Sequence, residues 1–115
     1  MNNNFSKDKI IEAAEMLGFN DKMSTVYMAS LELGGGTVSH ISKLSGVERV
    51  NTYYVLEQLK KDGFVYSGLL RKKTAYFAES PKKLLEAMEL RTKKFSEVLP
   101  QLLALENSNI SKPVI

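Results

Sequence analysis

The side chains best suited to specific chemistry lie in the middle of this 115-residue chain, between residues 37 and 73. Arg49 and Asn51 follow a glycine turn by a few residues. Arginine and asparagine are the side chains that pair bidentately with the base edges of guanine and adenine. Further along, Arg71, Lys72 and Lys73 form a run of cations between two apolar stretches, a pattern that suits phosphate oxygens. These residues therefore favour recognition of a nucleic acid.

The distribution of charge supports this interpretation. The formal net charge is only +3. Residues 37–73, however, carry seven basic and three acidic side chains, whereas residues 1–36 carry three and five, and residues 74–115 carry six and five. A polyanionic partner is therefore expected to meet the middle segment of the chain.

Two short helices are predicted to position these side chains. Thr37 can cap the first helix, in which Ile41 and Leu44 share one apolar face. Gly46 can adopt the left-handed conformation that ends this helix. The second helix follows and is expected to stop at Gly63.

In the second helix, Thr52, Leu56 and Leu59 recur at helical spacing and are expected to face the core. The runs FVYSGL and TAYFAES then predict two strands around a basic tip. Helix, turn, helix and basic hairpin predict a winged helix-turn-helix, mainly α with a small β-hairpin, whose second helix enters the major groove of double-stranded DNA. The residues expected to contact DNA are Thr37, Ser39, His40, Arg49, Val50, Asn51, Tyr54, Arg71, Lys72 and Lys73.

The segments before this unit predict two further helices. Ser6 or Asp8 can cap a helix over about residues 6–17, and Asn20 can cap the next one. The triple glycine 34–36 could suggest a phosphate-binding loop, but no strand precedes it and no Gly-Lys-Ser/Thr follows. We therefore interpret it as a flexible linker. The winged helix-turn-helix domain is then expected to cover residues 1–80.

A long helix is expected over residues 81–106, begun by Ser80-Pro81 and followed by a flexible tail at 107–115. Pro100 lacks an N–H and should kink or break this helix near Val98.

The apolar positions of this long helix predict a homodimer. Met88, Phe95 and Leu102 lie seven residues apart, as in a short heptad seam, which is interrupted by Arg91. A helix that extends beyond a small domain has little intrachain surface to cover, although packing on its own domain remains the alternative. The residues expected at the dimer interface are Leu84, Met88, Phe95, Val98, Leu102 and Leu105.

Composition excludes several classes of protein. The chain has no cysteine, which excludes disulfides and thiolate metal sites. It has no apolar run of transmembrane length, and its start, with a leader at Asn2–Asn4 expected to be disordered, has no signal-peptide core. A cytoplasmic protein with no membrane partner is expected. The single histidine, His40, cannot build a zinc site alone, so neither enzyme activity nor any cofactor or metal is expected.

Three stretches also carry a family resemblance: LGFNDKMSTVYMASLELGG, TVSHISKLSGVERVNTYYVLEQLKKDGFV and RKKTAYFAESPKKLLE. Over about residues 17–87 the chain resembles the DNA-binding domain of the TrmB-like family of winged-helix transcription regulators. The resemblance implies a sequence-specific regulator of the stand-alone type, without the family's sugar-sensing domain. Any unknown effector is then expected to act at the dimer interface or through another protein partner. Glu48 and Tyr54 depart from the family's pattern, so no base preference carries over.

A second hypothesis remains open at this point. The same fold also serves as a protein-interaction module within transcription or processing complexes, without sequence-specific DNA binding. Strong, salt-sensitive affinity for duplex DNA would distinguish the regulator from such a module.

Overall fold

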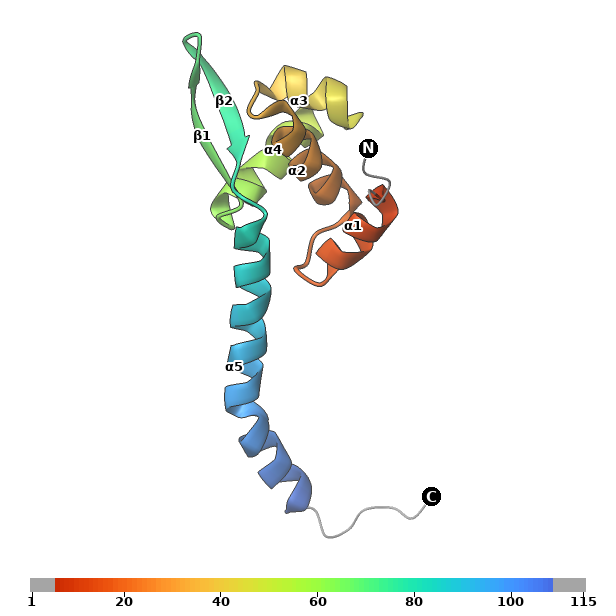
Figure 1. Ribbon diagram of the computed structural model, residues 1–115, viewed down its shortest axis with the longest axis vertical. Coiled ribbons are helices and arrows are strands. Elements are labelled where there is room, and N and C mark those ends of the chain that lie inside the picture. The colour runs from red at the N-terminus through yellow and green to blue at the C-terminus, as the bar shows by residue number, and fades with distance from the viewer. Residues whose placement is uncertain (1–5, 109–115) are drawn as a thin grey trace.

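The computed structural model describes residues 6–108, which form five helices and one two-stranded antiparallel sheet (Figure 1). The predicted leader at Asn2–Asn4 and the predicted tail from residue 109 onward lie outside the described residues. The elements are α1 (Lys7–Glu15), α2 (Asp21–Leu33), α3 (Val38–Ser45), α4 (Arg49–Lys61), β1 (Val65–Leu70), β2 (Lys73–Ala78) and α5 (Lys82–Asn107).

The helix boundaries follow from the capping residues that the sequence indicated. Asn20 Oδ1 accepts a hydrogen bond from the Met23 N–H at 2.8 Å, and Thr37 Oγ1 accepts one from the His40 N–H at 3.3 Å. Gly46 ends α3 with a left-handed φ of +75°. These expectations are confirmed.

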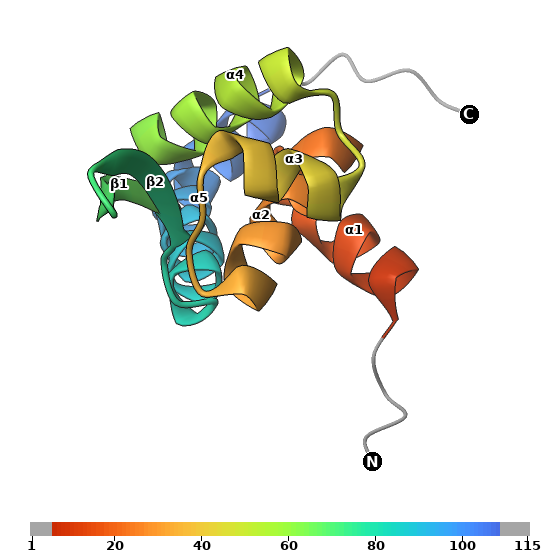
Figure 2. The same ribbon diagram turned by 90° about the horizontal axis from the view of Figure 1, so that it is seen from above.

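The core lies where α2 packs against both α3 and α4, with α1 covering one side (Figure 2). Ile41, Leu56 and Leu59 are fully buried there, as is Thr52, so the predicted inner face of α4 is confirmed. The expectation that Leu44 shares the buried face of α3 is wrong. Three residues on from Ile41, its side chain is turned about 60° around the helix and is exposed.

Two hydroxyl groups fix the turn between α3 and α4. The Ser42 hydroxyl donates a hydrogen bond to the Val47 carbonyl oxygen at 2.6 Å. The buried Thr52 hydroxyl lies 3.0 Å from the carbonyl oxygens of both Val47 and Glu48, and its single O–H is shared between these two acceptors. These bonds satisfy backbone groups in the turn and set α4 firmly against α3.

The triple glycine is not a flexible linker, and that prediction is wrong. Gly36 pairs with Tyr76 of β2: the Gly36 N–H donates to the Tyr76 carbonyl at 3.0 Å, and the Tyr76 N–H donates back at 2.8 Å. Gly35 has a φ of +120°, and a Cβ there would overlap the ring of Phe77. The glycines are therefore needed because the backbone passes directly over the hairpin.

Helix α5 extends away from the domain and gives the molecule its long dimension of 66 Å (Figure 1). It runs through Pro100 without a break, and its lower part bends. Leu84 and Met88 pack, half-buried, against the core of their own domain. One turn further on, Arg91 Nη1 donates a hydrogen bond to the Met16 carbonyl oxygen at 3.0 Å, which explains a cation at this position of the seam.

We predict that Gly35→Ala destabilises the protein far more than Gly34→Ala. Both glycines have positive φ, but a Cβ at Gly34 meets nothing within 4 Å. Gly34→Ala should therefore cost only the left-handed strain, about 1–2 kcal/mol. Gly35→Ala adds a clash with Phe77 and should cost about 2–5 kcal/mol. Urea unfolding of the two variants measures the difference, and equal losses would contradict close packing of the glycines on the hairpin.

Candidate nucleic-acid interface

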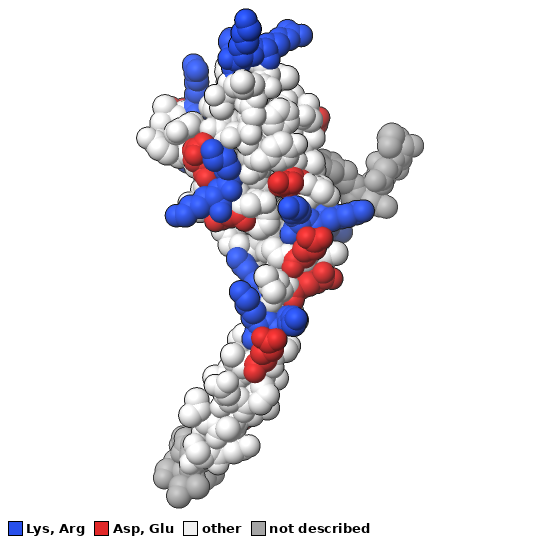
Figure 3. Space-filling model, turned by 90° about the vertical axis from the view of Figure 1, so that its left-hand side faces the viewer, with Lys and Arg blue, Asp and Glu red and all other residues white. Residues whose placement is uncertain are grey.

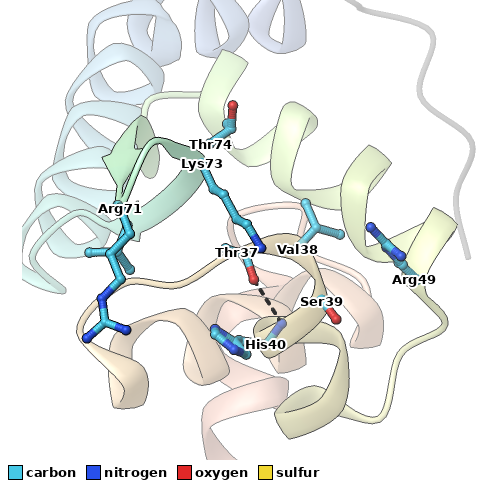
Figure 4. Close-up of a pocket in the computed structure, with 9 residues that line it drawn as sticks. Thr37, Val38, Ser39, His40, Arg49, Arg71, Lys73 and Thr74 are labelled. Atoms are coloured by element: carbon cyan, nitrogen blue, oxygen red, sulfur yellow. Dashed lines mark hydrogen bonds between the residues drawn. The ribbon is translucent and has the colours of Figure 1, made fainter.

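An open groove of about 750 Å³ lies between the hairpin and the N-terminal ends of α3 and α4 (Figure 4). We call the β1–β2 hairpin the wing and this groove the basic groove. It brings together six of the ten residues that the sequence singled out, from three separate elements. Its lining consists of Thr37, Val38, Ser39, His40, Arg49, Leu70, Arg71, Lys73 and Thr74.

The N-terminal end of α3 opens onto the basic groove. Thr37, at the cap, and Ser39, in the first turn, both contribute to the lining. The side chain of Lys73 extends from β2 toward this helix end (Figure 4). A helix N-terminus presents backbone N–H groups and a partial positive charge, so this arrangement suits a phosphate group.

The tip of the wing is a tight two-residue turn. Leu70 and Lys73 pair across it, and the central residues Arg71 and Lys72 have positive φ values of +52° and +68°. This is the geometry of a type I′ turn, which normally takes asparagine and glycine. Cations at both positions cost local strain, of the kind often found at functional sites. Lysine and arginine side chains gather at this end of the molecule (Figure 3).

The outer face of α4 carries the remaining predicted residues, all exposed: Val50, Asn51 and Tyr54. They do not line the basic groove. A second groove of about 450 Å³, which we call the apolar groove, lies beside it and is lined by Val38, Arg49, Val50, Tyr53 and Tyr54. Tyr53 is exposed here, and its ring packs edge-on against Tyr54, with the ring centroids 5.3 Å apart.

Sequence reasoning missed the role of Glu48. Its Oε1 accepts a hydrogen bond from the Asn51 N–H at 3.2 Å and so caps α4. A carboxylate is stabilised at a helix N-terminus by the helix dipole. Glu48 thereby orders the first turn of α4, on which Arg49 and Asn51 stand.

The sequence also gave no signal for the contact that sets the wing against α4. The Tyr76 hydroxyl donates a hydrogen bond to Glu57 Oε2 at 2.6 Å. Burial, reinforced by this bond and the charge of Glu57, raises the pKa of Tyr76 well above its ordinary value, so the phenol remains a donor. Together with the Gly36 pairing, this contact joins the wing to α4 and to the segment before α3.

Other kinds of site find little support in the described part of the chain. Within residues 6–108, no group of three or more histidine, aspartate or glutamate side chains could hold a metal ion. In the same residues, no helix is long and apolar enough to cross a lipid bilayer.

Helices α1–α4 pack around one core, and the antiparallel β1–β2 hairpin follows α4. This arrangement defines a winged helix-turn-helix of the kind found in DNA-binding transcription regulators. The family model for the sugar-specific transcriptional regulator TrmB matches residues 14–82. The chain therefore belongs to the TrmB family, as its sequence motifs indicated.

Solved structures share this fold. The archaeal chromatin protein TrmBL2 superposes with a TM-score of 0.65 at 24% identity, covering 96% of this chain and 48% of TrmBL2. The chain thus spans about half the length of that protein. A possible transcriptional regulator from Methanosarcina mazei Go1 gives 0.65 at 12% identity, covering 87% and 88% of the two chains. A MarR family regulator from Silicibacter pomeroyi gives 0.58 at 16% identity, covering 93% and 69%. No curated protein matches the sequence.

The strained tip offers a way to remove charge without disturbing the fold. The double variant Arg71→Asn, Lys72→Gly installs the preferred type I′ sequence, so its thermal stability should equal or exceed that of the wild type. If both cations bind phosphates, the slope of log affinity against log salt should flatten by about 0.9 for each phosphate that the variant no longer neutralises.

The matched control is Lys93→Ala, Lys94→Ala, which removes two charges from α5. It should leave the salt slope close to the wild-type value. Equal slopes for the wild type and the tip variant would place the wing tip outside the binding surface.

Proposed function

We propose that this protein is a sequence-specific transcription regulator that binds double-stranded DNA as a homodimer in the cytoplasm. One observation carries the proposal. The basic groove is lined by cations from the wing and from α4, beside the N-terminus of α3, and the described residues that line it include no acidic side chain. Such a surface fits a duplex better than a small anion, because its cations are spread over separate elements.

In the proposed complex, α4 enters the major groove and the wing lies along the backbone. Arg49 and Asn51, in the first turn of α4, are directed at base edges, where they can pair with guanine and adenine. Arg71 and Lys73 bind phosphates on the adjoining backbone, and the α3 N-terminus binds a further phosphate. Phosphate contacts then fix the register in which α4 reads the sequence.

The homodimer is supported by the part of α5 that its own domain does not cover. No residue of α5 is fully buried, and Phe95 is 62% exposed. Residues 98–105 contain no charged side chain and include five large apolar ones. Leu84 and Met88 already pack in their own domain, so we place the dimer seam from Phe95 onward, through Val98, Leu102 and Leu105. Two copies of α4 could then bind symmetric half-sites about one helical turn apart.

Specificity is tested at the start of α4. Arg49→Ala or Asn51→Ala should cost about 1–3 kcal/mol on a duplex selected from a random pool, and much less on an unselected duplex. Each side chain is exposed, so folding should be unaffected. Fluorescence anisotropy with the two duplexes measures both affinities. A loss of equal size on both would make the residue a backbone contact.

The dimer is tested by a charge in the seam. Phe95→Asp should yield a folded monomer, because the ring is mostly exposed within its own domain and a buried carboxylate would cost several kcal/mol at an interface. Affinity for a two-half-site duplex should fall sharply, while weak nonspecific binding persists. Sedimentation analysis reports the mass.

Lys93→Asp is the control, since it places a carboxylate about 160° away around the same helix, two residues from Phe95. It should remain dimeric. A wild-type protein that sediments as a monomer at micromolar concentration would rule out the dimer.

The second candidate function is a protein-interaction module, favoured by the exposed tyrosines on α4. Titration of a random duplex at increasing salt separates the two. A regulator should bind well at low salt and lose affinity steeply as salt rises. Absence of binding at low salt would refute the DNA-binding proposal and favour the module. The protein partner of such a module would then be sought at the exposed Tyr53 and Tyr54 of α4.

A further inference from the structure

The solvent-facing side of α4 carries large apolar side chains where polar ones are normally found. Val50 is 56% exposed and Tyr54 is 65% exposed, and both line the apolar groove. Among the described residues that line this groove, Arg49 alone is charged. A surface helix usually turns charged and polar residues toward solvent, so a contiguous apolar cluster there marks a surface that contacts a ligand.

The cluster is held in a defined geometry. Val50 and Tyr54 lie one helical turn apart and therefore share a face of α4. Tyr53 packs its ring edge to face against Tyr54, with ring centroids 5.3 Å apart and an interplanar angle of 68°. This contact restricts the exposed ring, and Val38 of α3 closes the other side of the groove.

The position of the apolar groove indicates its occupant. It shares Val38 and Arg49 with the basic groove, so the two surfaces are continuous. A duplex whose backbone lies on Arg71 and Lys73 would thus turn its base edges toward this part of α4. The charge of the neighbouring surface suits a polyanion rather than an apolar protein helix.

We propose that Val50 and Tyr54 recognise the C5-methyl groups of thymine in the major groove. This inference rests on the proposed function and gives it a base preference. The thymine methyl is the apolar group that a base pair displays in the major groove, and valine and aromatic side chains are suited to contact it. The protein's preferred sites therefore contain thymine at the positions opposite the apolar groove.

The test compares two alternating adenine–thymine duplexes of identical sequence, one of which contains deoxyuridine in place of thymine. The two differ only in the C5-methyl groups. The wild-type protein should bind the thymine duplex about fourfold more tightly for each methyl that it buries, since a buried CH₂ is worth about 0.8 kcal/mol. The double variant Val50→Ala, Tyr54→Ala should bind both duplexes equally.

Met16→Ala is the control variant. Met16 is 66% exposed, like Tyr54, but lies at the end of α1, so this variant should keep the wild-type methyl preference. Circular dichroism checks that all variants are folded, which is expected because the replaced side chains are exposed.

Two results would overturn the inference and leave DNA binding intact. One is equal wild-type affinity for the thymine and deoxyuridine duplexes. The other is a methyl preference that persists in the double variant, since the methyl would then act elsewhere or through the shape of the duplex. Failure of the wild type to bind either duplex at low salt would contradict the proposed function itself.

Discussion

The candidate nucleic-acid interface depends on one pairing, between Gly36 and Tyr76. Two backbone hydrogen bonds join the segment before α3 to β2, and the Tyr76 side chain reaches on to Glu57 of α4. One residue thus links the wing, the α3 N-terminus and α4. These hydrogen bonds restrain the three elements relative to one another, and with them the width of the basic groove. Glycine is required at position 35 because the chain passes against the ring of Phe77 there.

A second tyrosine secures the other end of the wing. The Tyr27 hydroxyl donates a hydrogen bond to the Glu79 carbonyl at 2.7 Å, and burial, with a smaller contribution from Glu79, raises the pKa of Tyr27 to about 12. This bond ties α2 to the point where β2 passes into α5. Arg91 adds a contact from α5 to the end of α1. The direction in which α5 leaves the domain is thereby set, and with it the separation of two recognition helices in the proposed dimer.

Local features of the sequence predicted most of the fold. Asn20 and Thr37 are capping residues whose effect extends over one helical turn, and the buried face of α4 follows from helical periodicity. The misses have a different origin. The pairing of Gly36 with Tyr76 joins residues far apart in the chain, so nothing beside the triple glycine indicates that it is hydrogen-bonded to the hairpin. The heptad pattern that Leu84 and Met88 share with Phe95 likewise gives no sign that these two residues are partly buried against the core of their own domain, and their place in a dimer interface stays a prediction.

The lining of the candidate nucleic-acid interface could be foreseen only in part, because the fold brings together residues that lie far apart in the sequence. Runs of cations and a capped helix are visible in sequence, and Arg49, Arg71 and Lys73 do line one groove. Glu48 caps the N-terminus of α4, although glutamate is not among the residues that usually cap helices. The apolar groove forms only because the fold places Val38 of α3 beside Tyr53 and Tyr54. Such surfaces depend on tertiary packing, which the order of residues does not display.

The central claim is that the wing and α4 form one rigid unit before DNA binds. Native-state hydrogen exchange of the Gly36 and Tyr76 amides tests it most directly, with the Leu56 amide inside α4 as the reference for the core. A rigid unit predicts that all three amides exchange only through global unfolding, with the same dependence on low concentrations of denaturant. If the Gly36 and Tyr76 amides exchange rapidly and without denaturant dependence while Leu56 stays protected, the wing is hinged and the claim is contradicted.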